Sequence, residues 1–550
     1  MKGFIQQREN LVAILLILLF VLISYLSMKN LSITADESKH YKYGTKILDR
    51  DASRLVNKKG LVDDSKMPFS ALNAFPAKMA NYIPGENVKF LPYGGIREFL
   101  NKFSTARLMT IFFSALVAWL VFYWSRSLYG FIPAVISLLL YIFDPNIIAH
   151  SQLVTTDLYG VGMTLFCFYY LWKFSKDKSP RTGFILAIML GLSQLAKYSS
   201  LYLFPLCLFM LVLFDCFSSD SFIGRRKVAA YLGKILYWIG IVSIVSLIVI
   251  NLGYWFNRSF TRLKDYNFQS EELKTIQETN SGLGNIPIPV PYPYLEGIDL
   301  VRYRERMGVG YGRIYLLGNL RDGDGFTGYF FVASLLKVPV ATQILLLLAL
   351  VTFVKDKKRQ ERLWDDEIFL LLPVLFFIIY LNFFYNTQIG IRHYLVIYPL
   401  AYIFSGQLFK NWKGFTKARQ IAFIVLGGYL IVSVLSYYPH YLAYFNEFVW
   451  DRKTAYKYLA DSNLDWDQGK NYLAEYREKH PDILYAPDSI SAGQIIVPVN
   501  YLVGVFGEIE DFQWLRENFE PTGTIAYSYL IYDISQQDVD VLCHSQYVCP

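Results

Sequence analysis

Long apolar stretches alternate with polar segments along most of this chain of 550 residues. A helix that crosses the hydrocarbon core of a bilayer needs about 20 mostly apolar residues, and about eleven segments approach that length. They are residues 11–28, 108–124, 131–143, 158–172, 182–196, 201–215, 231–254, 338–354, 368–385, 394–409 and 421–438. The shorter ones require little tilt or a locally thinner bilayer. The pattern therefore predicts an all-α polytopic membrane protein.

The first apolar segment, residues 11–28, is predicted to remain as a membrane span. It is too long for a cleavable signal, and no small-x-small cleavage site follows it.

Basic residues cluster in every second loop between the predicted spans. These clusters contain Lys2 and Arg8; Arg126; Lys173, Lys176, Lys178 and Arg181; Arg225, Arg226 and Lys227; Lys355, Lys357, Lys358, Arg359 and Arg362; Lys410, Lys413, Lys417 and Arg419. The positive-inside rule assigns such loops to the cytoplasm. With an odd number of spans, we expect a cytoplasmic N-terminus and a C-terminus on the outer side.

This topology places three long segments outside: residues 29–105, 256–326 and 439–550. The last is long enough for a small domain. We therefore expect a transmembrane module over residues 1–438, with outer loops at about 29–105 and 256–326, and an outer C-terminal domain over residues 439–550.

Short apolar runs in the C-terminal segment predict strands beside helices. Residues 494–504 (QIIVPVNYLVG) and 524–532 (TIAYSYLIY) suit strands, and residues 454–459 and 469–479 suit helices. A small α/β domain is the predicted result.

Composition supports a membrane protein. Charged residues make up 18% of the chain, below the roughly 25% of soluble domains. The aromatic share of 17% suits the interfacial belts of a multi-helix membrane protein. The net charge of +8 does not indicate nucleic-acid binding, because the basic residues lie in the short clusters that set topology.

The first candidate site follows the first span, at residues 35–44 (ADESKHYKYG). On a helix, Asp36, His40 and Tyr43 share one face by their spacing. A carboxylate at the membrane surface is partly desolvated, and desolvation raises its pKa and its basicity. Such a group suits a general base that takes a proton from a hydroxyl. A solvated acidic turn is the alternative.

A second outer loop, residues 144–157, carries two acids and His150. Asp157 stands at the start of a predicted helix, where an acid often caps the N-terminus. Alternatively it faces Asp36 and binds a sugar, a cation or a basic partner. Together with Glu37, it would offer the oxygen ligands that a divalent cation such as Mg²⁺ or Mn²⁺ needs. The spacing of these residues does not decide whether a metal ion binds.

Several cationic residues lie at predicted outer ends of spans: Arg107, Lys197, Arg392 and His393. Ionisable residues at membrane depth commonly have a function. A lipid phosphate leaving group needs their charge, and arginine offers it paired donors. Snorkelling to headgroups is the alternative for each residue alone. Four on one predicted side favour an anion site.

No Walker loop, GxGxxG or serine nucleophile elbow occurs in the chain. Cys543 and Cys549 form a C-x5-C pair on the predicted outer side, where an oxidising compartment permits a disulfide and two free thiols are the alternative.

Several motifs together resemble the GT-C glycosyltransferases, and most closely the protein O-mannosyltransferases of glycosyltransferase family 39 in their bacterial branch. The first motif is Asp36-Glu37 with Tyr41 and Gly44. Further similar blocks are residues 67–73 (MPFSALN), 106–108 (ARL), 128–130 (LYG), 150–157 (HSQLVTTD), 196–199 (AKYS), 315–318 (YLLG), 336–339 (LKVP), 389–394 (IGIRHY), 444–447 (YFNE) and 461–468 (DSNLDWDQ). The resemblance extends over nearly the whole chain.

This resemblance implies an inverting transfer of a sugar, of hexosyl or mannosyl type, from a polyprenyl-phosphate carrier to an acceptor hydroxyl. Asp36 would be the base, Glu37 a supporting acid and Asp157 a second acidic site residue. Arg107, Lys197 and Arg392 would bind the carrier phosphate. The bacterial branch implies the plasma (inner) membrane. Residue 467 is Asp where the pattern expects Gly, and His393 stands where an aromatic is expected.

Two other classes of protein remain alternatives. A flippase or transporter of lipid-linked sugars also has many helices, but transporters often show inverted repeats and midplane sites. A non-catalytic membrane assembly protein would not need acids and bases on one side. The sequence leaves open which sugar is moved and whether the acceptor is a protein, a lipid or a glycan.

Overall fold

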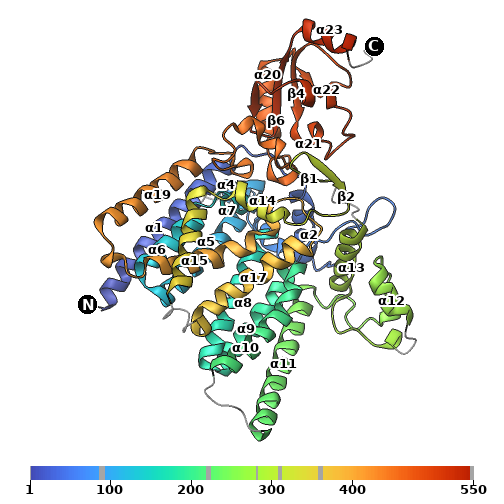
Figure 1. Cartoon of the computed structure of the whole chain (residues 1–550). Helices are drawn as coiled ribbons and strands as arrows, with labels where there is room; N and C mark the ends of the chain where they lie inside the picture. The colour runs from blue at the N-terminus through green and yellow to red at the C-terminus, as the bar shows by residue number, and fades with distance from the viewer. Residues whose placement is uncertain are drawn as a thin grey trace.

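The computed structural model describes residues 2–85, 93–218, 225–279, 283–307, 313–356 and 363–545. Each of the predicted spans coincides with a helix. These helices are α1 (Lys2–Met28), α5 (Phe103–Tyr129), α6 (Phe131–Ile142), α8 (Asp157–Asp177), α9 (Pro180–Ala196), α10 (Leu203–Ser218), α11 (Arg225–Gly253), α15 (Val340–Lys355), α17 (Ile368–Phe383), α18 (Tyr398–Gly406) and α19 (Lys417–Leu435). Figure 1 shows them side by side as the body of the molecule.

Four of the described helices are long and apolar enough to cross a membrane alone: Gln6–Met28, Phe103–Tyr129, Gly233–Gly253 and Lys417–Leu435. Two bent pairs add to them. α6 meets α7 (Pro145–Ser151) at 62°, and α14 (Tyr329–Lys337) meets α15 at 115°. The other predicted spans lie on shorter helices or, for α8, on a long helix that is less apolar than these four.

The outer loops carry their own short elements. The first contains α2 (Glu37–Leu48), α3 (Ser70–Ala80) and α4 (Tyr93–Asn101). The second contains α12 (Glu271–Thr279), α13 (Tyr292–Met307) and the antiparallel strands β1 (Arg313–Leu316) and β2 (Asn319–Asp322). In Figure 1, α12 and α13 project to one side of the helical body.

Gly44 allows α2 and α3 to approach closely. A Cβ at this position would collide with the backbone carbonyl of Ser70. Glycine is therefore required for the close contact that brings the start of α3 beside α2.

The C-terminal segment forms the predicted small α/β domain. Its sheet has the order β3 (Leu484–Tyr485), β4 (Gly493–Pro498), β6 (Tyr529–Ile534) and β5 (Gly523–Ile525). β3 pairs parallel with β4, and the other pairs are antiparallel. α20 (Lys470–Lys479), α22 (Gln513–Asn518) and α23 (Gln536–Ser545) accompany the sheet. Residues 524–532 were predicted as one strand, but a turn at 526–528 divides them between β5 and β6, with Ala526 and Tyr527 at positive φ.

Basic residues of the described loops pair with acids at helix ends away from the C-terminal domain. Arg126 pairs with Glu9, and Lys176 lies 3.2 Å from Asp366. Figure 1 shows the N-terminus at the left of the view, the ends of α10 and α11 at the bottom and the C-terminal domain at the top. The cluster at residues 357–362 and Cys549 lie outside the described residues, and nothing is described of the side chains of residues 225–227. Cys543 is disulfide-bonded.

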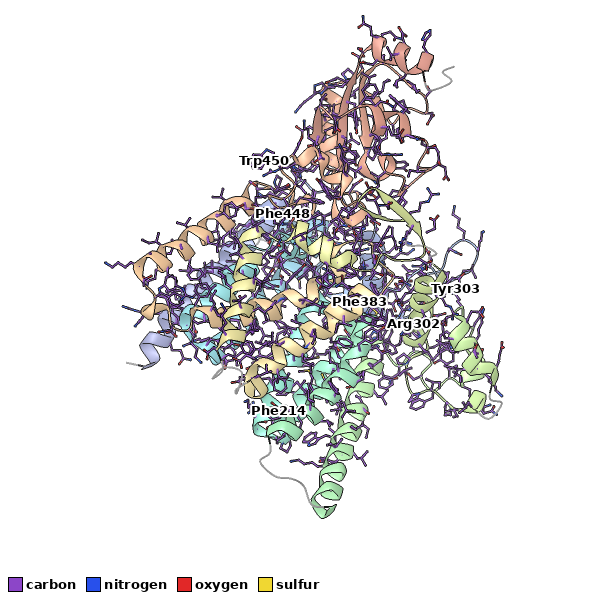
Figure 2. The ribbon with its side chains drawn as sticks, viewed as in Figure 1. Phe214, Arg302, Tyr303, Phe383, Phe448 and Trp450 are labelled. Atoms are coloured by element: carbon purple, nitrogen blue, oxygen red, sulfur yellow. The ribbon has the colours of Figure 1, made fainter. Side chains whose placement is uncertain are left out.

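Exposed aromatic side chains mark the boundary between the helical body and the C-terminal domain. Figure 2 shows Phe448 and Trp450 beside the end of α19, where this domain begins. Phe448 is 56% and Trp450 91% exposed. Aromatic rings at this kind of boundary suit the interface between lipid and water.

Candidate functional site

Asp36 lies between two cations at the start of α2. It occupies the N-cap position of that helix, and its side chain is 30% exposed. Lys66 donates to its Oδ1 at 3.1 Å, and Arg392 donates to its Oδ2 at 3.2 Å. The carboxylate thus joins the first outer loop to the loop after α17.

The pKa of Asp36 differs from the sequence-based expectation. Burial raises the pKa, but the charges of Lys66 and then Arg392 outweigh it and hold this pKa well below its ordinary value. The expectation of a raised pKa was therefore wrong, because no sequence pattern indicated that two cations would meet this carboxylate. Asp36 is ionised at neutral pH.

Glu37 has a different environment from its neighbour. It is fully buried, and Arg107 donates to both of its oxygens at 2.8 and 2.6 Å. The backbone N–H groups of Thr34 and Val154 also donate to it, each at 2.8 Å. Glu37 therefore ties three segments together, and it does not line the pocket described below.

Arg107 is occupied in the same way. Besides Glu37, it donates to the carbonyls of Leu31 and Ser32 at 3.0 and 2.7 Å. It does not line the pocket described below. The geometry therefore gives Arg107 a structural role and does not support the predicted phosphate role.

Asp157 and Lys197 form a second ion pair. Asp157 opens α8, Lys197 follows α9, and the Nζ and Oδ1 atoms lie 2.6 Å apart. Asp157 is nine-tenths buried, whereas Lys197 is 23% exposed. Gly160 faces this pair, since a Cβ there would lie 3.1 Å from the side chain of Lys197.

Arg392 stands between the two predicted acidic sites. Its guanidinium lies 4.0 Å from the centre of the Trp466 ring, a cation–π contact. The residue is 8% exposed, and its Nε has no hydrogen-bond partner among the described residues. A buried donor without a partner costs free energy. Arg392 therefore presents an unused donor beside Asp36.

The two histidines that were predicted as site residues lie in different surroundings in the structure. His150 is buried in α7, packs 6.1 Å from the Trp466 ring and does not line the pocket. His393 lines the pocket, and its Nδ1 lies 3.2 Å from the hydroxyl of Tyr385. Its Nε2 has no partner among the described residues. Burial, together with the charges of Lys197 and Arg392, holds the pKa of His393 well below its ordinary value, so this ring is neutral.

A single pocket collects most of these side chains. Its volume, including the open mouth, is about 1030 Å³. One part of its wall is polar: Asp36, His40, Lys66, Asp157, Lys197, Arg392 and His393. The other part is built from α13, α17 with the loop that follows it, and the turn after α9: Leu201, Tyr202, Ile298, Val301, Arg302, Glu305, Tyr380 and Tyr385. Figure 2 shows Arg302 on α13 facing the side of the body where Phe383 ends α17.

The pocket also contains residues that the sequence analysis missed. Lys66 immediately precedes the block 67–73, and its spacing from Asp36 follows no helical or strand pattern. Trp466 does not line the pocket but packs against Arg392, and it lies inside the block 461–468, which indicated family resemblance but no contact. The tyrosines Tyr202, Tyr380 and Tyr385 have no distinguishing signal among 43 tyrosines.

The carboxylates of the site do not fit a divalent cation. Asp36, Glu37 and Asp157 are each paired with a lysine or an arginine. In the part of the chain that the structure describes, no group of three or more His, Cys, Asp and Glu is placed to hold a metal. The proposed ligands Glu37 and Asp157 are already engaged by Arg107 and Lys197, and so they do not form the cluster of oxygen ligands that such an ion requires.

Comparison with known proteins finds a family for part of the chain. Residues 96–248 match the family described as dolichyl-phosphate-mannose-protein mannosyltransferase. This match confirms the resemblance indicated by the motifs, and it includes Arg107, His150, Asp157 and Lys197. No curated protein matches the chain.

Solved structures of membrane glycosyltransferases are similar at low identity. ArnT from Cupriavidus metallidurans bound to undecaprenyl phosphate has a TM-score of 0.48 and 9% identity, over 94% of this chain and 97% of that chain. The archaeal oligosaccharyltransferase AglB from Archaeoglobus fulgidus, in complex with an inhibitory peptide and a dolichol-phosphate, has a TM-score of 0.44 and 15% identity, over 86% of this chain and 58% of that chain.

Proposed function

Because residues 96–248 match the dolichyl-phosphate-mannose-protein mannosyltransferase family, we propose that this protein is a membrane glycosyltransferase that uses a polyprenyl-phosphate sugar. The donor sugar is of the hexosyl class, mannosyl by the description of the family. The acceptor is a hydroxyl on the outer side of the cell membrane.

One observation carries this proposal: a carboxylate and a set of cations share one pocket. Asp36, Arg392 and Lys197 all line it. Transfer from a lipid phosphate needs a group that accepts the proton of the acceptor hydroxyl and groups that stabilise the departing phosphate. The pocket offers both.

The reaction follows from these positions. The acceptor hydroxyl oxygen attacks the anomeric carbon from the face opposite the phosphate, and its proton passes to Asp36. The bond between the anomeric carbon and the phosphate oxygen breaks, and its electron pair remains on the polyprenyl phosphate. Arg392 and Lys197 stabilise that negative charge. A single displacement of this kind inverts the anomeric configuration.

The lowered pKa of Asp36 fits this sequence of events if the donor changes the partners of Arg392. In the free protein, Arg392 donates to Asp36. A donor phosphate competes for the guanidinium, because the phosphodiester is negatively charged and accepts paired hydrogen bonds. Asp36 then loses one of its two cations, and its basicity increases as the donor binds.

The apolar residues in the second part of the pocket wall suit the lipid portion of the donor. Leu201, Ile298 and Val301 lie beside tyrosines at this side. An apolar wall next to a cationic one is complementary to a molecule with a phosphate head and a hydrocarbon tail.

The positions of charged residues at the two ends of α1 support an active site on the outer side of the membrane. Asp36 lies at the end of α1 that is opposite to the Arg126–Glu9 pair. If the basic end faces the cytoplasm, the pocket opens on the outer side. This is the orientation with a cytoplasmic N-terminus and an outer C-terminus.

The test is sugar transfer by the purified protein in lipid vesicles. A radiolabelled polyprenyl-phosphate hexose is supplied with acceptor extract, and the Asp36→Asn variant is compared with the unchanged protein. Loss of transfer with retained binding of polyprenyl phosphate supports the proposal. Full turnover by this variant contradicts the role of Asp36.

A further inference from the structure

The segment 461–468 after the last predicted span contacts the loop that carries the pocket residue Arg392, although it is distant in sequence from the residues that line the pocket. We propose that Asn463 and Lys337 are positioning residues that hold Arg392 beside Asp36. The inference rests on the proposed function in one respect, because it gives Arg392 the donor phosphate as its ligand.

Asn463 holds the loop that carries Arg392. It is fully buried, and its side-chain oxygen accepts from the backbone N–H of Ile391 at 3.0 Å. Its amide nitrogen donates to the hydroxyl of Tyr329 at 2.9 Å and to the carbonyl of Ala460 at 3.1 Å. Both ends of this amide are therefore used, and the residue before Arg392 is fixed to it.

Ser462 makes a second attachment to the same loop. Its hydroxyl donates to the carbonyl of Ile389. Gly390 has a φ of +133°, and a Cβ at this position would collide with the Ser462 hydroxyl oxygen. The glycine is therefore required by the close approach of the two segments, and residues 389–391 are held at both ends.

Lys337 fixes Asn463 from the opposite side. It is fully buried at the end of α14. Its Nζ donates to the carbonyl of Asn463 at 2.6 Å and to that of Leu442 at 2.8 Å, and it lies 4.8 Å from the centre of the Phe445 ring. Lys337 forms no salt bridge among the described residues. Such a buried lysine is costly unless its donors are satisfied, and here two carbonyls satisfy them.

Trp466 completes the support of Arg392. Its ring stacks against the guanidinium, and its backbone carbonyl accepts from the N–H of Ala35, the residue before Asp36. One segment therefore contacts the loop of Arg392 and the loop of Asp36. The relative position of these two side chains depends on it, and a shift of about 1 Å in such an arrangement costs roughly a hundredfold in rate.

The test measures the position of the loop and the binding of donor phosphate in the full-length protein. Asn463→Leu removes all three hydrogen bonds of the amide at similar volume, and Lys337→Met removes the two bonds of the lysine. We expect faster hydrogen exchange at the N–H of Ile391 in both variants. We also expect the KM for the polyprenyl-phosphate sugar to rise about tenfold to a hundredfold, with a smaller change in the KM for the acceptor.

Two variants keep the inference testable if these proteins fold poorly. Asn463→Asp retains an oxygen that accepts from Ile391, so the slow exchange of that N–H should be largely restored. Tyr329→Phe removes one hydrogen bond from Asn463 and should produce a smaller increase in exchange. Lys479→Met, an exposed lysine in α20, is the matched control and should change neither measurement.

The outcomes separate this inference from the proposed function. Arg392→Ala is measured beside the other variants for binding of a short-chain polyprenyl phosphate. If it binds weakly while Asn463→Leu and Lys337→Met bind normally, the positioning role is overturned and the proposed function stands. If Arg392→Ala binds polyprenyl phosphate normally, the phosphate role of Arg392 is overturned. Independently of that result, an unchanged hydrogen-exchange rate at the N–H of Ile391 in Asn463→Leu would overturn the positioning role.

Discussion

Arg107 donates two hydrogen bonds to the carboxylate of Glu37, and both side chains are almost completely buried. The pair joins α5 to the start of α2, and the same carboxylate also accepts from the backbone N–H of Val154 in the loop 144–157. The side chain next to the proposed base therefore fixes the geometry of the site without facing the substrate.

Breaking this pair should affect stability before it affects catalysis. Glu37→Gln and Arg107→Met each leave the partner buried without its counter-charge, which costs about 3–5 kcal/mol. We expect a lower thermal midpoint for both variants in detergent, measured by intrinsic fluorescence. The double variant should recover part of the loss. A normal midpoint together with a raised donor KM would instead restore the phosphate role of Arg107.

Asp36→Asn should remove the proton acceptor and leave the fold intact. The amide keeps the shape of the side chain but does not take the proton of the acceptor hydroxyl. A loss of about a hundredfold to ten thousandfold in kcat is expected for a general base. Asp63→Asn is the control, because Asp63 is a half-exposed acid of the same loop that pairs with Lys39. Equal losses in the two variants would argue against a special role for Asp36.

Lys66→Met should change the pH dependence of the reaction. Burial raises the pKa of Asp36, and Lys66 contributes the largest opposing effect. Without Lys66 the pKa rises, so the carboxylate becomes protonated at a higher pH and kcat/KM falls earlier on the acid side. The profile of kcat/KM against pH checks this, with Lys39→Met as the control. An unchanged acid limb would show that Asp36 does not control it.

The sequence predicted the helical body because each span carries its own apolar signal. It also indicated Asp36, Asp157, Lys197, Arg392 and His393, which the structure brings to one pocket. These residues stand at the ends of predicted spans on one side, so topology alone places them near one another.

The pairings within the site could not be predicted in this way. Arg107 and Lys66 are both basic residues near the outer ends of helices, yet one is bound to buried Glu37 and the other faces Asp36. Which cation meets which acid depends on the packing of α2 against α3 and α5. Trp466 reaches Arg392 only because the chain returns to the outer loops after its last span.

Arg392→Ala should weaken binding of the donor more than that of the acceptor. The buried guanidinium has an unused Nε donor and lies at the polar wall of the pocket. Losing a charge-assisted hydrogen bond to phosphate costs about 1.5–3 kcal/mol, or roughly tenfold to a hundredfold in donor KM. Arg313→Ala, which alters a half-exposed arginine in β1, is the control. Equal increases in both KM values would contradict a phosphate role.

Asp465 should make the C-terminal part of the protein less stable at alkaline pH. Burial raises the pKa of this carboxyl to about 7. The unfolded chain has the ordinary value of 3.8, so between these values the folded state binds the extra proton and stability falls as the pH rises. Above pH 7 the Asp465 carboxylate is charged in the folded state, and the full free-energy cost of burying that charge lowers the stability. Asp465→Asn stays neutral and retains an oxygen for the N–H of Asp467. The thermal midpoint of this variant should therefore exceed that of the unchanged protein at about pH 8, and the two midpoints should differ little near pH 4. A constant difference between the midpoints across this range would refute the burial of an ionisable Asp465.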